Sequence, residues 1–188
     1  MMKTEIEKAL NILKNGGVIL YPTDTVWGLG CDATNMEAVE KINKIKGRSE
    51  DKSFIVLLDN DSKIQSYVTE IPDVAYDLIE YAENPLTIIF SGAKNVAPNV
   101  INTDGTVGIR VVRHEFCQQL LQRFRKPITS TSANLSGQPT PQIFDDIAEE
   151  IKEAVDYVVD WEQEISVPKK PSTIMKLAPG GQFSFIRR

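Results

Sequence analysis

The sequence has few of the residues on which disulfide-rich, zinc-binding and histidine-dependent proteins rely. It contains two cysteines, Cys31 and Cys117, and one histidine, His114. Two isolated cysteines cannot form a disulfide framework and lack metal-ligand spacing, so we expect a reducing, cytoplasmic compartment. His114 precedes a predicted helix, where a capping or surface role is favoured over catalysis. A G-x-S-x-G motif is also absent, which argues against a Ser-His-Asp hydrolase.

Long apolar runs and a strong net charge are missing as well. No stretch approaches the roughly 20 apolar residues of a membrane-spanning helix, and the charged start, MMKTEIEKAL, is not that of a secretion signal. The net charge of −5 argues weakly against a protein that coats nucleic acid, although it is compatible with a local basic groove. A Walker A motif, internal repeats and low-complexity tracts are absent too.

The chain does have the composition of a globular domain. Its 188 residues, of which 41% are hydrophobic, suffice for one domain with a substantial core. Helical and β-type patterns alternate, which predicts a single α/β domain, residues 1–188, with a mixed sheet and flanking helices. Capping boxes are expected at Thr4/Glu7 and Thr34/Glu37. Helices are predicted over 4–15, 35–45, 72–81, 115–124 and 143–154, and strands over 18–21, 54–58, 86–90, 107–112, 127–131, 157–160, 172–177 and 183–186.

The stretch 18–33, VILYPTDTVWGLGCDA, begins as a strand and then becomes polar without becoming helical. The polar residues 23–25 follow the carboxyl end of the strand, where ligands of α/β proteins usually bind; a plain polar turn is the alternative. Gly28 and Gly30 indicate either a close approach of other atoms to the backbone or a positive φ. They also match a loose dinucleotide-binding fingerprint, but residues 22–27 separate them from the strand, which argues against that motif.

Two further polar clusters have a two-residue spacing. Lys46 and Arg48 would point to one side of an extended backbone, which favours an anion such as a phosphate or carboxylate. Two solvated charges after a helix are the alternative. Ser132 and Asn134 can donate to a phosphate oxygen or can simply form a turn. Neither cluster decides between these alternatives by itself.

Five motifs follow one another along the chain: YPTDTVWGLGCDA (21–33), KGR (46–48), GTVGIRV (105–111), TSTSANLSGQP (129–139) and PSTI (171–174). In this order they resemble the YrdC-like family of threonylcarbamoyl-adenylate synthases, and the resemblance covers nearly the whole chain. It implies a twisted, open, mixed sheet with flanking helices around a large concave cavity, in the short, single-domain form of the family. Arg113 is a departure, because the family commonly has proline at this position.

The resemblance implies a nucleotidyltransferase that joins L-threonine, bicarbonate and ATP into threonylcarbamoyl-AMP and pyrophosphate, with Mg²⁺ accompanying ATP and no dedicated metal site. A transferase complex would then carry the threonylcarbamoyl group to N6 of adenosine 37 in tRNAs that read codons beginning with A. One alternative is a module that binds double-stranded RNA or tRNA. Another is a YrdC-like paralogue that acts on a different carbamoyl-type substrate, as in hydrogenase-maturation proteins.

The same motifs imply roles for single residues. Because Lys46 and Arg48 are expected to face solvent in the empty cavity, alanine at either position should abolish adenylate formation and leave the fold intact. The catalytic residues would be Lys46, Arg48, Ser132 and Asn134. Threonine is expected to contact Thr23, Arg110, Ser130 and Ser172, with Arg110 on its carboxylate. ATP is expected to contact Lys46, Arg48, Thr106, Ser132, Asn134, Thr140 and Arg187.

Overall fold

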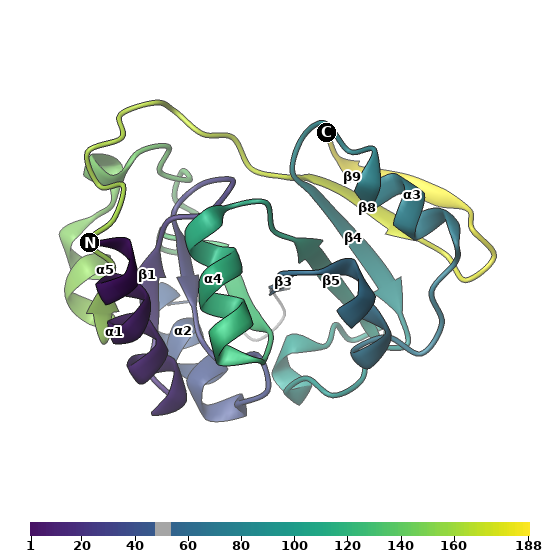
Figure 1. Ribbon diagram of the computed structural model, residues 1–188, viewed down its shortest axis with the longest axis horizontal. Helices are drawn as coiled ribbons and strands as arrows, with labels where there is room; N and C mark the ends of the chain where they lie inside the picture. The colour runs from purple at the N-terminus through teal and green to yellow at the C-terminus, as the bar shows by residue number, and fades with distance from the viewer. Residues whose placement is uncertain (48–53) are drawn as a thin grey trace.

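The computed structural model describes residues 1–47 and 54–188. Within these residues, nine strands form one sheet in the order β7-β1-β2-β6-β3-β5-β4-β8-β9 (Figure 1). The pairs β1/β7, β3/β5 and β4/β8 are parallel and the other neighbours are antiparallel, so the predicted mixed sheet is confirmed. The strands are β1 Ile19–Tyr21, β2 Gly28–Gly30, β3 Ile55–Leu58, β4 Leu86–Ser91, β5 Thr106–Val111, β6 Ile128–Ser132, β7 Tyr157–Val158, β8 Thr173–Leu177 and β9 Phe183–Arg187.

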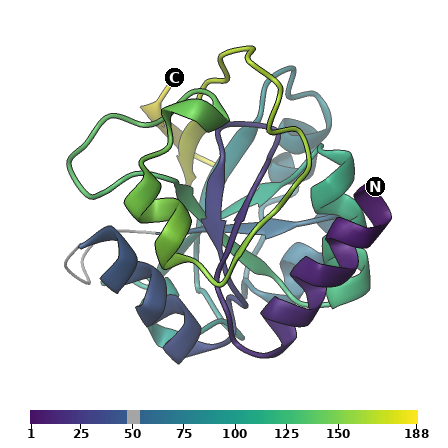
Figure 2. The ribbon, with the colours of Figure 1, turned by 90° about the vertical axis from the view of Figure 1, so that its left-hand side faces the viewer.

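Helices cover both faces of the sheet near β1 and β2 (Figure 2). α1 and α4 pack together on one face, and α2 and α5 lie on the other. Side chains alternate between the two cores along β1, where Ile19 and Leu20 point to opposite faces. The α-helices are α1 Met2–Lys14, α2 Met36–Lys46, α3 Val74–Glu80, α4 Glu115–Phe124 and α5 Glu149–Ala154, and 3₁₀ turns span Asp61–Ser66, Pro98–Val100 and Phe144–Asp146.

The helix starts differ from the predicted ones. α1 begins at Met2 without a side-chain cap, so the capping box at Thr4 is wrong. α2 is capped instead by Asn35, whose Oδ1 accepts hydrogen bonds from two backbone N–H groups at 3.0 and 3.1 Å. Thr34 cannot cap this helix because its hydroxyl donates to Asp32 at 2.6 Å. The second capping box is therefore also wrong.

The single helix predicted over 143–154 is interrupted. It consists of the 3₁₀ turn Phe144–Asp146 and the short helix α5, with extended backbone at Ile147 and Ala148 between them. The break allows Phe144 to pack on Trp27, with ring centroids 4.8 Å apart, while Ile147 enters the core. Tertiary packing thus overrides the helical periodicity of this segment.

The two glycines of the 18–33 stretch form β2, a strand that the sequence did not predict. Neither Gly28 nor Gly30 has a positive φ. A Cβ atom on Gly30 would lie 2.6 Å from Cε1 of Tyr21 and 2.7 Å from the carbonyl oxygen of Thr129. The close approach to the backbone is therefore confirmed and the positive φ is wrong. The approaching atoms at Gly30 belong to the protein itself.

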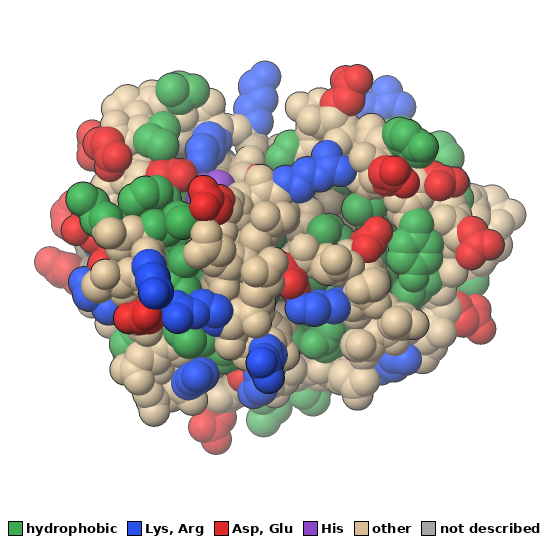
Figure 3. Space-filling model, viewed as in Figure 1, with side chains coloured by type: hydrophobic (Ala, Val, Ile, Leu, Met, Phe, Trp, Pro, Cys, Tyr) green, Lys and Arg blue, Asp and Glu red, His purple; other side chains and the backbone are tan. Residues whose placement is uncertain are grey.

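The face of the molecule shown in Figure 3 has no large region of one charge. On the face shown in Figure 3, Lys and Arg side chains are mixed with Asp and Glu side chains. Among the residues that the structure describes, no helix is long and apolar enough to cross a membrane.

Candidate active site

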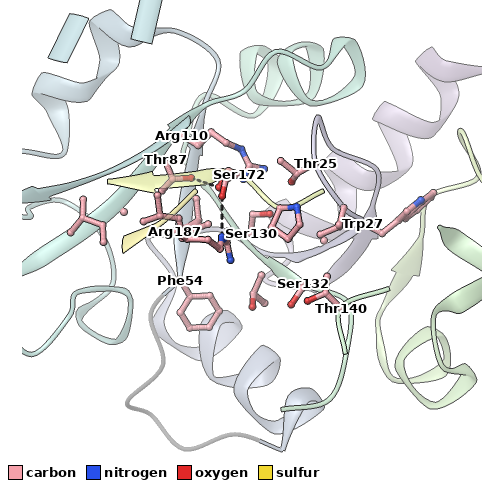
Figure 4. Close-up of a pocket in the computed structure, with 18 of the residues that line it drawn as sticks. Thr25, Trp27, Phe54, Thr87, Arg110, Ser130, Ser132, Thr140, Ser172 and Arg187 are labelled. Atoms are coloured by element: carbon pink, nitrogen blue, oxygen red, sulfur yellow. Dashed lines mark hydrogen bonds between the residues drawn. The ribbon is translucent and has the colours of Figure 1, made fainter. Parts of the chain in front are cut away.

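A cavity of about 230 Å³ lies against one face of the sheet (Figure 4). Its lining comes from strands that are far apart in the sequence, including β3, β5, β4, β6 and β8. The aromatic side chains of Trp27 and Phe54 also border it. Of the predicted site residues, the following line the cavity: Arg110, Ser130, Ser132, Thr140, Ser172 and Arg187.

Thr23 does not line the cavity but shapes the loop beside it. Its hydroxyl donates to the carbonyl of Val26 at 2.8 Å and accepts from the N–H of Thr25 at 3.0 Å. Its own carbonyl accepts a hydrogen bond from Lys169 at 2.9 Å. Thr25, two residues further on, reaches the cavity wall. Thr23 therefore positions this part of the wall from behind.

Lys46 and Asn134 are not part of the cavity lining. Lys46 is the last residue of α2, and Gly47 adopts a left-handed conformation with φ of 56°, so the extended backbone expected at Lys46 is wrong. The Lys46 side chain is buried rather than solvent-facing. Its Nζ donates to the carbonyl of Ser132 and, at 2.6 Å, to the carbonyl of Asn134. Arg48 lies outside the described residues.

The side chain of Asn134 holds the same loop together. Its Nδ2 donates to the carbonyls of Leu135 and Gln138 at 2.9 and 2.8 Å. Its Oδ1 is buried without a hydrogen-bond partner in the described part of the chain. Asn134 and Lys46 thus fix the turn that follows Ser132 and leads towards Thr140.

Thr106 lies at the start of β5 in a small polar network. Its hydroxyl donates to Oδ1 of Asp104 at 2.6 Å and accepts from Nδ2 of Asn102 at 2.9 Å. Hydrogen bonds from Lys176 and then Thr106 lower the pKa of Asp104 to about 2. Thr106 is not part of the cavity lining, but Asn102 is, so this network supports the rim of the cavity.

Arg110 carries a buried positive charge into the cavity. Its side chain is 3% exposed, and its Nη2 lies 3.2 Å from Oδ1 of Asp24, which is 8% exposed. The contact lacks hydrogen-bond geometry, since Nε and Nη2 have no hydrogen-bond partner among the described residues. Asp24 lies outside the cavity lining, and its other oxygen accepts from the backbone N–H of Arg113 at 3.2 Å. Arg110 is therefore held from one side and keeps donors for an anion.

A β-bulge turns Arg187 into the cavity. Phe185 lies opposite Met175, which is buried in the core on the other face of the sheet. The register then shifts, so that Arg187 pairs with Ile174, a residue of the cavity wall. Without the bulge, the alternation of side chains along β9 would place Arg187 on the same face as Phe185.

The cavity therefore contains two guanidinium groups. Burial and then the charge of Arg110 lower the pKa of Arg187. The Nε of Arg187 donates to the carbonyl of Ser172 at 3.0 Å, which fixes its position in the wall. Because two like charges in one partly buried site are unfavourable until an opposite charge joins them, this arrangement favours a ligand with one or more anionic groups.

Two residues of the site region differ from what the sequence suggested. His114 occupies the position before α4 but makes no capping hydrogen bond; its Nε2 contacts Oε2 of Glu162 at 3.1 Å. Thr87, a polar residue within the apolar run of β4, is not among the predicted site residues. It is buried in the cavity wall, and its hydroxyl lies 2.8 Å from that of Ser172. A lone hydroxyl in a central strand is the signal that could have identified it.

Comparison with known proteins agrees with this architecture. The family model of Sua5/YciO/YrdC, described as telomere recombination, matches residues 11–188. The chain belongs to the Sua5/YciO/YrdC family. This confirms the resemblance seen in the sequence motifs. A relative from Pseudoalteromonas translucida, named threonylcarbamoyl-AMP synthase, is 36% identical over 184 residues, which are 96% of this chain and 97% of the relative.

Solved structures of the Sua5/YciO/YrdC family have the same fold. The crystal structure of E. coli YciO is 27% identical with a TM-score of 0.85, and the match covers 100% of this chain and 90% of that one. P. abyssi Sua5 complexed with L-threonine is 28% identical with a TM-score of 0.81. That match covers 92% of this chain, which spans about half (50%) of the P. abyssi protein.

Proposed function

We propose that this protein is a nucleotidyltransferase that makes threonylcarbamoyl-AMP from L-threonine, bicarbonate and ATP and releases pyrophosphate. The names of its curated relatives and the threonine complex of P. abyssi Sua5 support this assignment. The main structural support is that Arg110 and Arg187 lie in one cavity together with several hydroxyl groups. The single histidine of the sequence, His114, is not part of the cavity lining.

The site residues fit a reaction between anions. The amine of threonine and bicarbonate give a carbamate and water, and a carbamate oxygen then attacks the α-phosphorus of ATP as pyrophosphate leaves. Each reacting species carries an anionic group, so positioning and charge neutralisation contribute more than proton transfer by a side chain. A cavity with guanidinium and hydroxyl donors provides these two contributions.

Arg110 is the proposed partner of the threonine carboxylate, because its unpaired donors suit a planar carboxylate. Ser130 and Ser172 border the same space, and Thr23 shapes the adjoining loop. The proposed ATP contacts are Ser132, Thr140 and Arg187 in the cavity wall, with Asn134 and Thr106 at its margin and Lys46 and Arg48 on the phosphates.

Lys46 has a more specific requirement under this proposal. In the structure, the ammonium group of Lys46 donates hydrogen bonds to the backbone carbonyls of Ser132 and Asn134. Contact with phosphate therefore requires an exchange of at least one of these hydrogen bonds for a phosphate oxygen. A phosphate oxygen carries a negative charge and a carbonyl oxygen does not, so the attraction between opposite charges favours this exchange.

Mg²⁺ is proposed to arrive with ATP and not to occupy a protein site of its own. In residues 1–47 and 54–188, no group of three or more His, Cys, Asp and Glu side chains is arranged to hold a metal ion. Mg²⁺ is commonly bound by substrate phosphates together with one or two protein groups. The chemistry that it supplies is neutralisation of charge on the leaving pyrophosphate.

The product is proposed to serve tRNA modification in the cytoplasm. Threonylcarbamoyl-AMP is a mixed anhydride and therefore an activated donor, from which a second protein would transfer the threonylcarbamoyl group to N6 of adenosine 37 in tRNAs that read codons beginning with A. The partners are therefore a transferase complex and, directly or through it, tRNA.

The test is pyrophosphate release from ATP and Mg²⁺, with threonine and bicarbonate each added and omitted. Release that needs both compounds is expected. Release without threonine would contradict the proposed substrate. No release under any condition would favour the paralogue with another carbamoyl-type substrate or the RNA-binding module, and a salt-dependent RNA titration would distinguish these two.

A further inference from the structure

Gly108 is a glycine in the middle of β5, on the floor of the cavity. Its φ is not positive, so the backbone does not require glycine here. A Cβ atom at this position would meet Cγ2 of Thr87 at 3.4 Å, the carbonyl oxygen of Phe54 at 3.7 Å and Cγ1 of Ile89 at 3.9 Å, which are ordinary contacts. Glycine inside a strand is less stable than alanine and often marks a close approach of a ligand.

Gly30 shows the opposite situation in the same sheet. There an added Cβ would lie 2.6 Å from a ring carbon of Tyr21 and 2.7 Å from a backbone oxygen. The protein itself excludes a side chain at Gly30, whereas nothing in the described protein does so at Gly108. The absence of a side chain at Gly108 therefore benefits something that enters the cavity.

The surroundings of Gly108 define what can enter. The hydroxyl of Thr87 is engaged with Ser172 at 2.8 Å, while its Cγ2 methyl faces Gly108. The methyl carbon of Thr87, a side-chain carbon of Ile89 and the carbonyl oxygen of Phe54 border the space over Gly108, so its walls are mostly apolar. Arg110 follows two residues later on the same face of β5 and carries the unpaired donors.

We propose that the space over Gly108 accepts the side-chain methyl group of threonine, and that Gly108 thereby determines the selectivity for threonine over serine. This inference rests on the proposed function. With the carboxylate on Arg110, the amino acid places its side chain over Gly108, and its hydroxyl can reach the hydroxyl pair of Thr87 and Ser172. Serine lacks the methyl group and leaves the apolar space unfilled.

The test compares the wild type with Gly108→Ala. Pyrophosphate release gives kcat/KM for threonine and for serine, and thermal unfolding reports stability. The wild type should prefer threonine at least tenfold, the lower range for one methyl group in a fitted pocket. In Gly108→Ala, the added methyl takes the space, so kcat/KM for threonine should fall about tenfold and that for serine less than about threefold. Tm should stay at or above that of the wild type.

Thr87→Ser provides a second variant that keeps the hydroxyl and removes the bordering methyl group. It should also reduce the preference for threonine, because the threonine methyl then loses a contact. Gly30→Ala is the contrasting control and should lower Tm strongly.

A wild type without threonine-dependent release would refute the proposed function itself. This inference alone would be overturned if the wild type is active with threonine and the Gly108→Ala variant keeps the wild-type ratio of kcat/KM for threonine to kcat/KM for serine. The same holds if the variant loses activity equally with both substrates.

Discussion

The contact between Asp24 and Arg110 allows a prediction that connects stability with substrate binding. Both side chains are nearly buried, and Asp24 touches the guanidinium from outside the cavity. Asp24→Asn keeps the size of the side chain and removes its charge. The variant therefore leaves Arg110 charged, buried and without its counter-ion.

The expected magnitude follows from this burial. Removal of one partner from a buried ion pair typically costs about 3–5 kcal/mol. The Asp24–Arg110 contact lacks hydrogen-bond geometry, and Arg110 also borders a cavity, so we expect the free energy of unfolding to fall by about 2–3 kcal/mol. For a chain of this size, this corresponds to a decrease in Tm of roughly 4–12 °C.

Substrate binding separates this positioning role from a merely structural one. If Asp24 orients Arg110 for the threonine carboxylate, Asp24→Asn should raise KM for threonine about tenfold and leave KM for ATP nearly unchanged. Asp32→Asn is a matched control, because Asp32 is also buried and pairs with Lys126 at 2.6 Å away from the cavity. It should lower Tm without changing either KM. An Asp24→Asn enzyme with wild-type Tm and wild-type KM for threonine would refute the reasoning.

Two further predictions concern single charged residues. Lys46→Ala should lower the free energy of unfolding, measured in urea, by about 1–3 kcal/mol, because the Nζ of Lys46 donates hydrogen bonds to carbonyls of the loop 132–134. The control is Lys44→Ala, on the exposed side of α2, which should change this free energy by less than about 0.5 kcal/mol. Equal urea midpoints of unfolding for the two variants would contradict the prediction. The pKa of Asp104 is lowered from 3.8 to about 2, chiefly by Lys176, so its stabilising effect is present above pH 3.8 and is lost as the pH falls towards 2. Asp104→Asn should lower the free energy of unfolding by less than about 1 kcal/mol at pH 6, since the Asp104–Lys176 ion pair is half exposed. The decrease in Tm relative to the wild type should be smaller at pH 2.5 than at pH 6. A decrease in Tm that does not depend on pH would count against a role of the ion pair.

Several elements could be predicted from local sequence because neighbouring residues determine them. α4 has the predicted bounds, Glu115–Phe124, since its apolar residues repeat at helical spacing. The apolar run 54–58 contains the strand β3, in which Val56, Leu57 and Leu58 are buried. The strands predicted over 172–177 and 183–186 correspond to β8 and β9, which pair with each other.

Predictions that depended on a single residue's surroundings were less successful. The capping boxes at Thr4 and Thr34 were wrong, because no local pattern shows that Asp32 engages Thr34. Lys46 was expected to face solvent and is buried, since its partners follow β6, far away in the sequence. Solvent exposure depends on which distant segments pack together, and the order of residues does not reveal this.

The sequence by itself determined the family, the mixed α/β class, the order of most elements and the polar clusters that follow its strands. Only the tertiary structure decided which of those polar side chains share one cavity. Arg187 reaches it because a bulge reverses its face, and Arg110 keeps free donors because Asp24 holds it from behind. Local patterns reflect interactions within a few residues, whereas strand register and buried ion pairs join residues that only the folded chain brings together.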